Sequence, residues 1–435
     1  MNYFFETYGC QMNIAESAAM EQTLKSLGWQ PAKAADEASL VIINSCSVRI
    51  TAERRVFGRL AHYKSLKKKL PLNVLLAGCM ASRLGGDALE KGADYVLGAN
   101  QKQFLPEIIR EIEQKEPVTH IFTEKSQYTF ANNHHKEGTF SSFVPIMHGC
   151  NNFCAYCIVP YVRGREISRS PADIATEIEA LAAGKTCEII LLGQNVNSYC
   201  WENGAKPMRF PDLLQFIAGK IEGTPIKWVR FLSSHPKDFS SETIEVIAQN
   251  PCFCRHIHLC VQHGSNRVLQ AMNRRYTREH YLGLVERIRG KMPEVSLSTD
   301  ILVGFPGETE AEFEEILTLM EKVRFLYAYT YHYNPREGTA AFDLPDRIDK
   351  ETKIRRLTRV MELQQTHTTE ILTRRIGSTE TVLVEGVSRR NPRELICRTG
   401  RDETVAAPGE ASLVGAFARA AIASVKGNTF KGNLV

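Results

Sequence analysis

The 435-residue sequence has no long apolar run, and this absence limits the kinds of protein it can encode. No stretch approaches the roughly 20 apolar residues that a membrane-spanning helix requires. The opening residues MNYFFETYGC also lack a basic segment followed by an apolar one, which is the usual form of a secretory signal. We therefore expect a cytoplasmic protein with no membrane partner. In a reducing compartment the twelve cysteines would not form disulfides, so they indicate metal or redox chemistry.

A strong excess of charge is missing as well. The formal net charge is +5, and 24% charged with 43% hydrophobic residues is ordinary for a globular protein. The charge is uneven, because residues 374–435 contain ten Lys or Arg and six Asp or Glu, a net charge of +4. This basic segment suggests contact with RNA phosphates, but a solvated basic surface explains it equally well.

A fourth cysteine is absent from the densest cysteine motif, MHGCNNFCAYCIV. Cys150, Cys154 and Cys157 have C-x3-C-x2-C spacing, and the next cysteine is Cys187. Thiolate sites for zinc or an iron–sulfur cubane usually have four protein ligands. Three ligands around a cluster leave one metal open, as catalytic sites require. The alternative is a zinc site completed by a distant residue such as His148.

Short apolar runs alternate with helical stretches along most of the chain. Runs at 2–9, 38–45, 72–78 and 93–99 predict a parallel sheet with helices on both faces in an N-terminal domain, 1–118. A polar linker follows at 119–140. Six more runs between 142 and 333 fit either a complete or partial α/β barrel or a doubly wound sheet, within a domain at 141–370. Short strand-like pieces at 374–435 predict a small β-barrel.

Three further cysteines each follow a predicted strand of the N-terminal sheet. Cys10 ends FFETYGC, Cys46 ends LVIINSC and Cys79 ends VLLAGC. Because the carboxyl ends of parallel strands meet at one edge, these cysteines could converge there. A single cysteine of this kind would be interpreted as a buried small hydrophobe. Three at equivalent positions indicate a second cluster site, again with three ligands.

The segment GCNNFCAYC resembles the iron–sulfur motif of the radical S-adenosylmethionine (SAM) enzymes. This resemblance implies a barrel for the central domain and a [4Fe-4S] cluster on Cys150, Cys154 and Cys157. It implies that the open iron is chelated by the amino and carboxylate groups of SAM, which one electron then cleaves to a 5′-deoxyadenosyl radical. It also implies that Tyr156 lies near the adenine.

The double set of cysteines resembles the methylthiotransferase family, nearly from end to end. The resemblance implies an N-terminal methylthiotransferase domain carrying a second [4Fe-4S] cluster on Cys10, Cys46 and Cys79, a radical SAM domain and a TRAM RNA-binding domain. Segments such as YGCQMN, LLGQNVNSY and STDILVGFPGETE are most similar to the branch that acts on tRNA. The implied reaction adds a methylthio group to C2 of N6-isopentenyladenosine at position 37, next to the anticodon.

Other activities remain open at this point. The same chemistry could act on threonylcarbamoyladenosine in tRNA or on a ribosomal-protein aspartate, or the chain could be a non-catalytic iron–sulfur protein that binds RNA. For the enzyme, the resemblance implies three partners: the tRNA anticodon stem-loop, an electron donor such as flavodoxin or ferredoxin, and a sulfur source.

Residues at predicted strand ends are the candidates for SAM contacts. The resemblance and their position indicate Gly193, Gln194, Asn195, Ser234 and Gly304. Further along the cluster loop, Arg163 and Arg165 could reach the SAM carboxylate or tRNA phosphate, unless they form an exposed basic turn. In the tail, RRNPRE at 389–394 is the best candidate for a phosphate-contacting loop.

The sequence also departs from the family pattern in HLCVQHGSN. Cys260 and His263 stand where the family more often has Pro and Ser, which puts local contacts to SAM or substrate in doubt. The remaining cysteines show no ligand spacing and are interpreted as structural: Cys187, Cys200, Cys252, Cys254 and Cys397.

Overall fold

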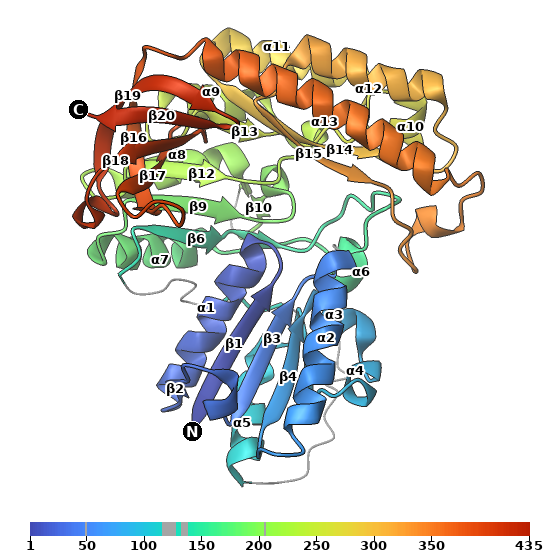
Figure 1. Cartoon of the computed structure of the whole chain (residues 1–435), viewed down its shortest axis with the longest axis vertical. Coiled ribbons are helices and arrows are strands. Elements are labelled where there is room, and N and C mark those ends of the chain that lie inside the picture. The colour runs from blue at the N-terminus through green and yellow to red at the C-terminus, as the bar shows by residue number, and fades with distance from the viewer. Residues whose placement is uncertain (48–49, 115–127, 132–137, 204–205) are drawn as a thin grey trace.

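A computed structural model describes residues 1–47, 50–114, 128–131, 138–203 and 206–435, which form three units (Figure 1). The predicted fold class is confirmed: a parallel-sheet unit, a partial α/β barrel and a closed β-barrel. Most of the predicted linker at 119–140 lies outside the described residues. Among the described residues, no helix is both long and apolar enough to cross a membrane.

The N-terminal unit is a five-stranded parallel sheet of order β2-β1-β3-β4-β5 with helices on both faces (Figure 1). Alternate apolar residues of its central strands pack against α1 and α5 on one face and against α2 and α3 on the other. Its elements are β1 (Asn2–Tyr8), α1 (Gln11–Ser26), β2 (Gln30–Pro31), β3 (Leu40–Ser45), α2 (Ile50–Leu66), β4 (Asn73–Gly78), α3 (Cys79–Leu84), α4 (Asp87–Glu90), β5 (Tyr95–Gly98) and α5 (Leu105–Gln114).

The central unit is a barrel of six parallel strands in the order β6-β9-β12-β13-β14-β15. Two isolated bridges join its two three-stranded sheets, and the described residues show no pairing between β6 and β15, so the barrel is open. Strands and major helices are β6 (Ser141–Pro145), α7 (Pro171–Ala183), β9 (Glu188–Leu192), α8 (Phe210–Ile221), β12 (Trp228–Phe231), α9 (Ser241–Gln249), β13 (His256–His258), α11 (Arg278–Lys291), β14 (Ser296–Val303), α12 (Glu310–Val323), β15 (Tyr327–His332) and α13 (Lys350–Thr373).

Shorter helices and strands lie at the carboxyl ends of the barrel strands. These are β7 (Met147–His148), α6 (Val159–Arg163), β8 (Ile167–Ser168), β10 (Cys200–Trp201), β11 (Met208–Arg209) and α10 (Asn266–Ala271). Several barrel helices begin at a side chain that accepts a backbone N–H, such as Ser170 before α7 and Thr309 before α12. Local sequence therefore fixes where these helices start.

The C-terminal unit is a closed barrel of order β16-β17-β18-β20-β19. It consists of β16 (Thr379–Val387), β17 (Glu394–Thr399), β18 (Thr404–Pro408), β19 (Phe417–Lys426) and β20 (Thr429–Leu434). The small β-barrel predicted for 374–435 is thus confirmed, and β20 closes it between β18 and β19. This unit docks where barrel strands begin: Arg230 donates to the Thr399 carbonyl, and Trp228 packs edge-on against Phe417. The opposite ends of the strands face the N-terminal unit.

Candidate active site between the N-terminal and central units

The three N-terminal cysteines lie together at one edge of the sheet. β1, β3 and β4 are neighbours, and their register aligns Tyr8 with Ser45 and Ser45 with Gly78. Cys46 and Cys79 directly follow the last residues of β3 and β4. Cys10 lies two residues after the end of β1 and is the N-cap of α1. The parallel sheet thus brings together residues 36 and 33 positions apart in sequence.

Thiol and guanidinium groups are in direct contact at this edge. The Cys46 thiol donates a hydrogen bond to Cys10, and this bond together with the charge of Arg163 outweighs burial and lowers the pKa of Cys10 to about 5. Arg163 Nε donates to Cys79 Sγ at 3.1 Å. Cys10 is exposed, whereas Cys46 and Cys79 are buried. The edge therefore favours the thiolate form of Cys10, whereas burial raises the pKa of Cys79.

A buried ion network, formed by Glu16, Lys102 and Arg163, joins this edge to the central unit. Glu16 forms two ion pairs: its Oε1 lies 2.8 Å from Arg163 Nη1, and its Oε2 lies 2.5 Å from Lys102 Nζ. Burial raises the pKa of Glu16, but the two cations lower it further, to about 2. His148 contacts Arg163 at 3.3 Å, and burial holds its pKa well below the ordinary value, so the imidazole is neutral. Burial lowers the pKa of Lys102, and the charge of Glu16 opposes this shift. When Lys102 is protonated, the network carries one excess positive charge.

The central cysteines lie on a loop that many backbone contacts hold in place. Cys150 N donates to the Gly164 carbonyl, and Asn273 Nδ2 donates to the Asn152 and Phe153 carbonyls. Phe153 itself has a φ of 48°, a left-handed conformation that a tight loop requires. Burial raises the pKa of Cys150 to about 11 and that of Cys157 to about 12. Ligation by iron would therefore release protons from these thiols.

Arg274, which the sequence patterns did not identify, sits beside this loop. It is buried, and its Nη1 donates to Cys154 Sγ at 3.3 Å while Nη2 donates to the Cys260 carbonyl at 2.7 Å. Tyr156 OH is 3.5 Å from the same Nη1. A buried guanidinium cannot lose its proton, so Arg274 places a fixed positive charge beside the thiolates.

The two sets of cysteines lie close together across the interface between the units. Cys79 packs in one buried cluster with Ile158 and Val162, and Ile158 directly follows Cys157. Arg163, at the end of α6, reaches from this same loop to Cys79. This contact corrects the expectation that Arg163 is free to meet SAM or tRNA, because its guanidinium is already buried in the ion network.

Two of the predicted SAM contacts present unpaired polar atoms. Gln194 Oε1 and Ser234 Oγ are buried and have no hydrogen-bond partner among the described residues. They lie just after β9 and β12, on the side of the barrel that carries the cysteine loop. Unpaired buried polar atoms are costly, so these positions fit a bound polar ligand such as SAM.

The neighbouring candidates shape the same region. A Cβ on Gly193 would lie 2.4 Å from Met147 Cγ, so only glycine fits the chain beside β7. Asn195 is engaged within the protein: its Nδ2 donates to Asp238, and its Oδ1 accepts from the His235 backbone. Asn195 thus joins the ends of β9 and β12, and a direct SAM contact by this side chain stays a prediction.

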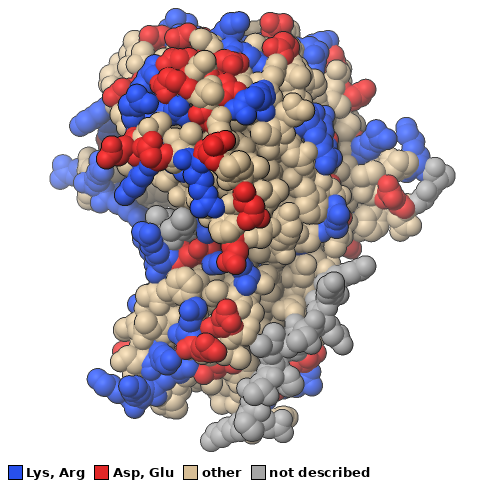
Figure 2. All heavy atoms as spheres, turned by 90° about the vertical axis from the view of Figure 1, so that its right-hand side faces the viewer, with Lys and Arg blue, Asp and Glu red and all other residues tan. Residues whose placement is uncertain are grey.

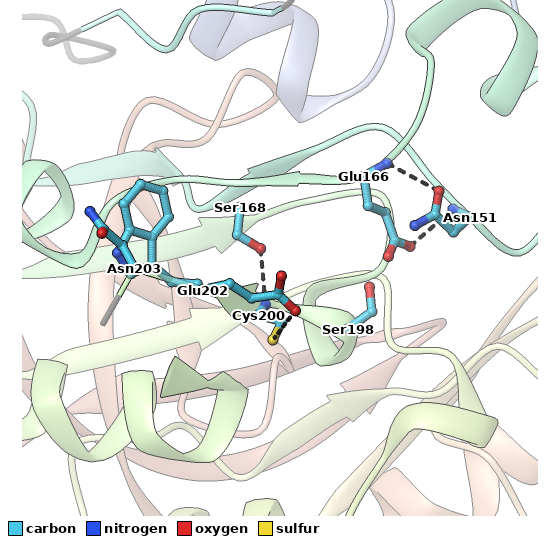
Figure 3. Close-up of a pocket in the computed structure, with 8 residues that line it drawn as sticks. Asn151, Glu166, Ser168, Ser198, Cys200, Glu202 and Asn203 are labelled. Carbon is cyan, nitrogen blue, oxygen red and sulfur yellow. Dashed lines mark hydrogen bonds between the residues drawn. The ribbon is translucent and has the colours of Figure 1, made fainter. Parts of the chain in front are cut away.

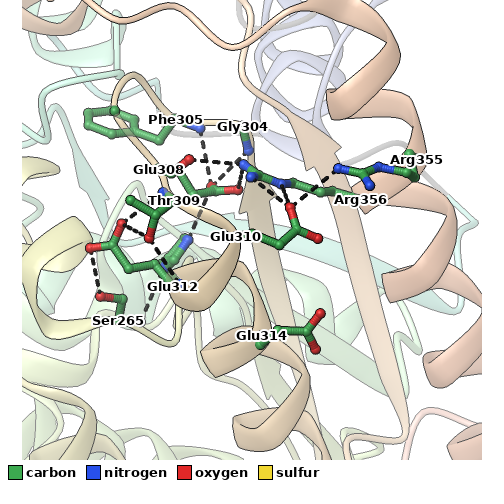
Figure 4. A network of polar contacts seen from close by, with 12 residues as sticks. Ser265, Gly304, Phe305, Glu308, Thr309, Glu310, Glu312, Glu314, Arg355 and Arg356 are labelled. Atoms are coloured by element: carbon green, nitrogen blue, oxygen red, sulfur yellow. Dashed lines mark hydrogen bonds and ion pairs between the residues drawn. The ribbon is translucent and has the colours of Figure 1, made fainter.

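Gly304 lies in a turn that a buried carboxylate holds in place (Figure 4). Its φ is 70°, and its N–H donates to Glu308 Oε2 at 2.8 Å. Arg356 donates to Glu308 Oε1 at 2.7 Å, and His263 Nε2 lies 3.1 Å from Oε2. His263 therefore supports the turn after β14 from inside the protein, which gives this departure from the family pattern a structural role.

A polar pocket adjoins the outer side of the cysteine loop (Figure 3). Asn151, next to Cys150, exchanges hydrogen bonds with Glu166, and the Ser168 hydroxyl accepts from the Cys200 backbone. These contacts tie the loop to β8 and β10. The pocket is lined by Asn151, Glu166, Ser168, Ser198, Cys200, Trp201, Glu202 and Asn203.

The alternative of a zinc site completed by His148 finds no support in the geometry. One ring nitrogen of His148 is 2.8 Å from Asn100 Oδ1 and the other contacts Arg163. Its ring also stacks on Tyr128, with centroids 3.6 Å apart. Both nitrogens are therefore used in the interface and neither is directed to the cysteine loop.

Comparisons with known proteins agree with this architecture. Residues 144–320 match the radical SAM superfamily, residues 2–98 match the family described as uncharacterized protein family UPF0004, and residues 373–435 match the TRAM domain. A solved radical SAM methyltransferase, TsrM from Kitasatospora setae, has a TM-score of 0.60 over 79% of this chain and 74% of its own, at 15% identity. At that identity the likeness shows the fold alone.

Full-length relatives are far more similar. The chain is 49% identical to the tRNA-2-methylthio-N(6)-dimethylallyladenosine synthase of Treponema pallidum, covering 100% of this chain and 99% of the relative. It is 48% identical to the enzyme of the same name from Treponema denticola, covering 100% of both chains. This chain therefore belongs to the radical SAM family of tRNA-2-methylthio-N6-dimethylallyladenosine synthases.

Proposed function

We propose that the protein is a transferase that adds a methylthio group to C2 of N6-isopentenyladenosine (N6-dimethylallyladenosine) at position 37 of tRNA, next to the anticodon. The observation that carries this proposal is the arrangement of two cysteine trios across one interface, with Cys79 packed against the loop of Cys157. Relatives of equal length and closely similar sequence are named for this modification.

The central trio suits a cluster with one open iron. Cys150, Cys154 and Cys157 would hold three irons, and the unpaired atoms of Gln194 and Ser234 lie at the adjoining strand ends. When bound, the cluster and SAM supply the one-electron chemistry that breaks the strong C2–H bond of an aromatic ring. Arg274 places a fixed positive charge beside Cys154, and Phe305, next to Gly304, packs in one cluster with Ala155 of the cysteine loop.

The N-terminal trio suits a second [4Fe-4S] cluster. Glu16, Lys102 and Arg163 leave one buried positive charge beside Cys10 and Cys79. An oxidised [4Fe-4S] cluster with three thiolate ligands carries about one net negative charge. The two charges compensate each other, and this balance supports an anionic centre here, which would hold the sulfur that receives a methyl group from SAM.

The substrate is tRNA, and basic side chains suited to its phosphates occur on the surface. Arg389, Arg390 and Arg393 are exposed in the loop between β16 and β17. Figure 2 shows Lys and Arg interspersed with Asp and Glu over the face that it presents. These groups would hold the anticodon stem-loop while the modified base is unstacked into the site. An electron donor such as flavodoxin or ferredoxin and a sulfur source complete the reaction.

Nucleoside mass spectrometry of tRNA from a deletion strain tests the proposal. The methylthio form of isopentenyladenosine should disappear and the unmodified form should accumulate. Loss of a methylthiolated threonylcarbamoyladenosine instead, or no change in tRNA, would assign the chemistry to a different substrate.

Anaerobic reconstitution tests the cofactors separately. With SAM and dithionite the protein should produce 5′-deoxyadenosine and contain about eight irons per chain, as two four-iron clusters require. A protein that bears iron and binds RNA but produces no 5′-deoxyadenosine would be a non-catalytic iron–sulfur protein.

A further inference from the structure

A separate group of metal-ligand side chains lies on β13 and β14, which Figure 1 labels, and on the residues just after β13. His258, Cys260 and Asp300 each offer one ligand atom, and these atoms lie within 4.8 Å of one another. In the part of the chain that the structure describes, no other trio of His, Cys, Asp or Glu is grouped so closely. None of the three belongs to the cysteine trios already described.

The strand pattern directs these side chains into the barrel. Ile257 and Leu259 are fully buried in the core that packs against the helices. Because side chains alternate along a strand, His258 and Cys260 point to the opposite, inner face. β14 lies beside β13 and places Asp300 two residues beyond Ser298, the register partner of His258.

We propose that His258, Cys260 and Asp300 bind a mononuclear zinc ion. Nε2 of His258 is 3.3 Å from Cys260 Sγ and 3.6 Å from Asp300 Oδ2. Tetrahedral zinc, with Zn–S near 2.3 Å and Zn–N and Zn–O near 2.0 Å, separates N from S by about 3.6 Å and N from O by about 3.3 Å. The observed separations differ by only a few tenths of an ångström, which small side-chain rotations would absorb.

Hydrogen bonds already hold the His258 ring in place. His258 Nδ1 is 2.9 Å from Ser298 Oγ, and the same hydroxyl lies 2.8 Å from His256 Nε2. On the far side of His256, Nδ1 is 3.9 Å from Asp402 Oδ2 in the C-terminal barrel. Such a chain fixes the ring and leaves Nε2 of His258 facing Cys260 and Asp300, as in metal sites where the second nitrogen of the ligand is hydrogen-bonded.

One carboxylate and one thiol line the site. Asp300 Oδ2 lies 3.6 Å from His258 Nε2 and brings negative charge to the space between the three side chains. The Arg274 guanidinium lies on the other side, where it donates to the Cys260 carbonyl and to Cys154 Sγ. When zinc binds, His258 would coordinate through Nε2 and the Cys260 thiol proton would pass to solvent.

Three protein ligands leave the fourth zinc position open. His258 and Asp300 are partly exposed on the inner face, so a water molecule can occupy this position. The site does not depend on the proposed tRNA reaction, since metal binding is measured without substrate or turnover.

The test is zinc analysis and zinc K-edge X-ray absorption on the full-length protein with its iron–sulfur clusters, after anaerobic incubation with one equivalent of zinc and gel filtration. We expect about one zinc per chain, with one sulfur ligand near 2.3 Å and the remaining ligands N or O near 2.0 Å. Cys260→Ser should lower zinc affinity at least tenfold at unchanged iron content, and Ser298→Ala should lower it about 10- to 100-fold.

Cys252→Ser is the matched control, because Cys252 has the same intermediate exposure as Cys260. This variant should retain the zinc. His258→Gln replaces the first variant if Cys260→Ser does not fold. The proposal is overturned if the wild-type protein retains no zinc, if zinc shows three or four sulfur ligands, or if Cys260→Ser retains as much zinc as the wild type.

Discussion

Replacing Glu16 with Gln should open the interface between the N-terminal and central units. The change keeps the size of the side chain but removes the buried anion that Arg163 and Lys102 share. Lys102 can release its proton in response, whereas Arg163 cannot. Removing one partner of a buried ion pair typically costs about 3–5 kcal/mol. The lowering of the Glu16 pKa from 4.5 to about 2 corresponds to about 3 kcal/mol, which agrees with this range.

Hydrogen–deuterium exchange measures this loss of stability segment by segment. The method is suitable because a protein of several units need not unfold in one step. Amides of α1 and α6 should exchange about 10²- to 4 × 10³-fold faster in the variant, since each 1.4 kcal/mol is a factor of about ten. The matched control is Glu179→Gln on α7. Glu179 forms an exposed ion pair with Lys220 and should change exchange by less than about twofold. Equal effects of the two variants would refute the role of the buried network.

The same network gives a pH dependence of known sign. The pKa of Glu16 is depressed in the folded protein, so its contribution is present in full above pH 4.5. The contribution is lost as the pH falls from 4.5 towards 2. The difference in stability between wild type and Glu16→Gln should therefore be constant at neutral pH and shrink in acid. A difference that grew in acid would contradict the assignment.

Three other changes test the remaining parts of the site. Cys154→Ala should abolish formation of 5′-deoxyadenosine from SAM while leaving the iron of the N-terminal site in place, as measured by chromatography and iron analysis of one sample. If cleavage survives, the C-x3-C-x2-C motif is not the SAM site. Replacing Arg389, Arg390 and Arg393 together with Ala should reduce the slope of log Kd for tRNA against log salt by about 2–3, because each phosphate contact contributes about 0.7–0.9. An unchanged slope would mean that these arginines contact solvent and not the tRNA phosphates. Glu308→Gln should loosen the turn after β14 and raise the Kd for SAM about tenfold or more, as loss of a charged hydrogen bond predicts, at constant iron content. An unchanged Kd would limit Glu308 to a structural role.

Much of the architecture followed from local patterns. Alternating apolar runs and helical stretches predicted the parallel sheet, and the position of Cys10, Cys46 and Cys79 after three strands predicted one common edge. The six runs of the central domain did not distinguish a barrel from a doubly wound sheet, because both use the same local pattern. The decision depends on which strands pair, and the bridge between Ser234 and Leu259 joins the two halves.

The sequence did not reveal the groups that surround the cysteines. Glu16 and Lys102 look like ordinary surface charges on a helix and a loop, and Arg274 lies in a basic stretch without any motif. Their roles arise only when α1, α6 and the loop after α10 meet, which brings Arg163 to Cys79 and Arg274 to Cys154. Local periodicity carries no information on such contacts, because the paired residues are 84 and 120 positions apart in the sequence.

The sequence by itself therefore determined the chemistry available to this protein: two sets of three cysteines, each placed at strand ends, and a basic tail. Tertiary structure alone decided that both sets share one interface and that a buried positive charge lies between them. It also decided that His258, Cys260 and Asp300 meet inside the barrel. The physical reason is that ligand spacing and strand periodicity are local properties, whereas burial, charge balance and strand order depend on how distant segments pack.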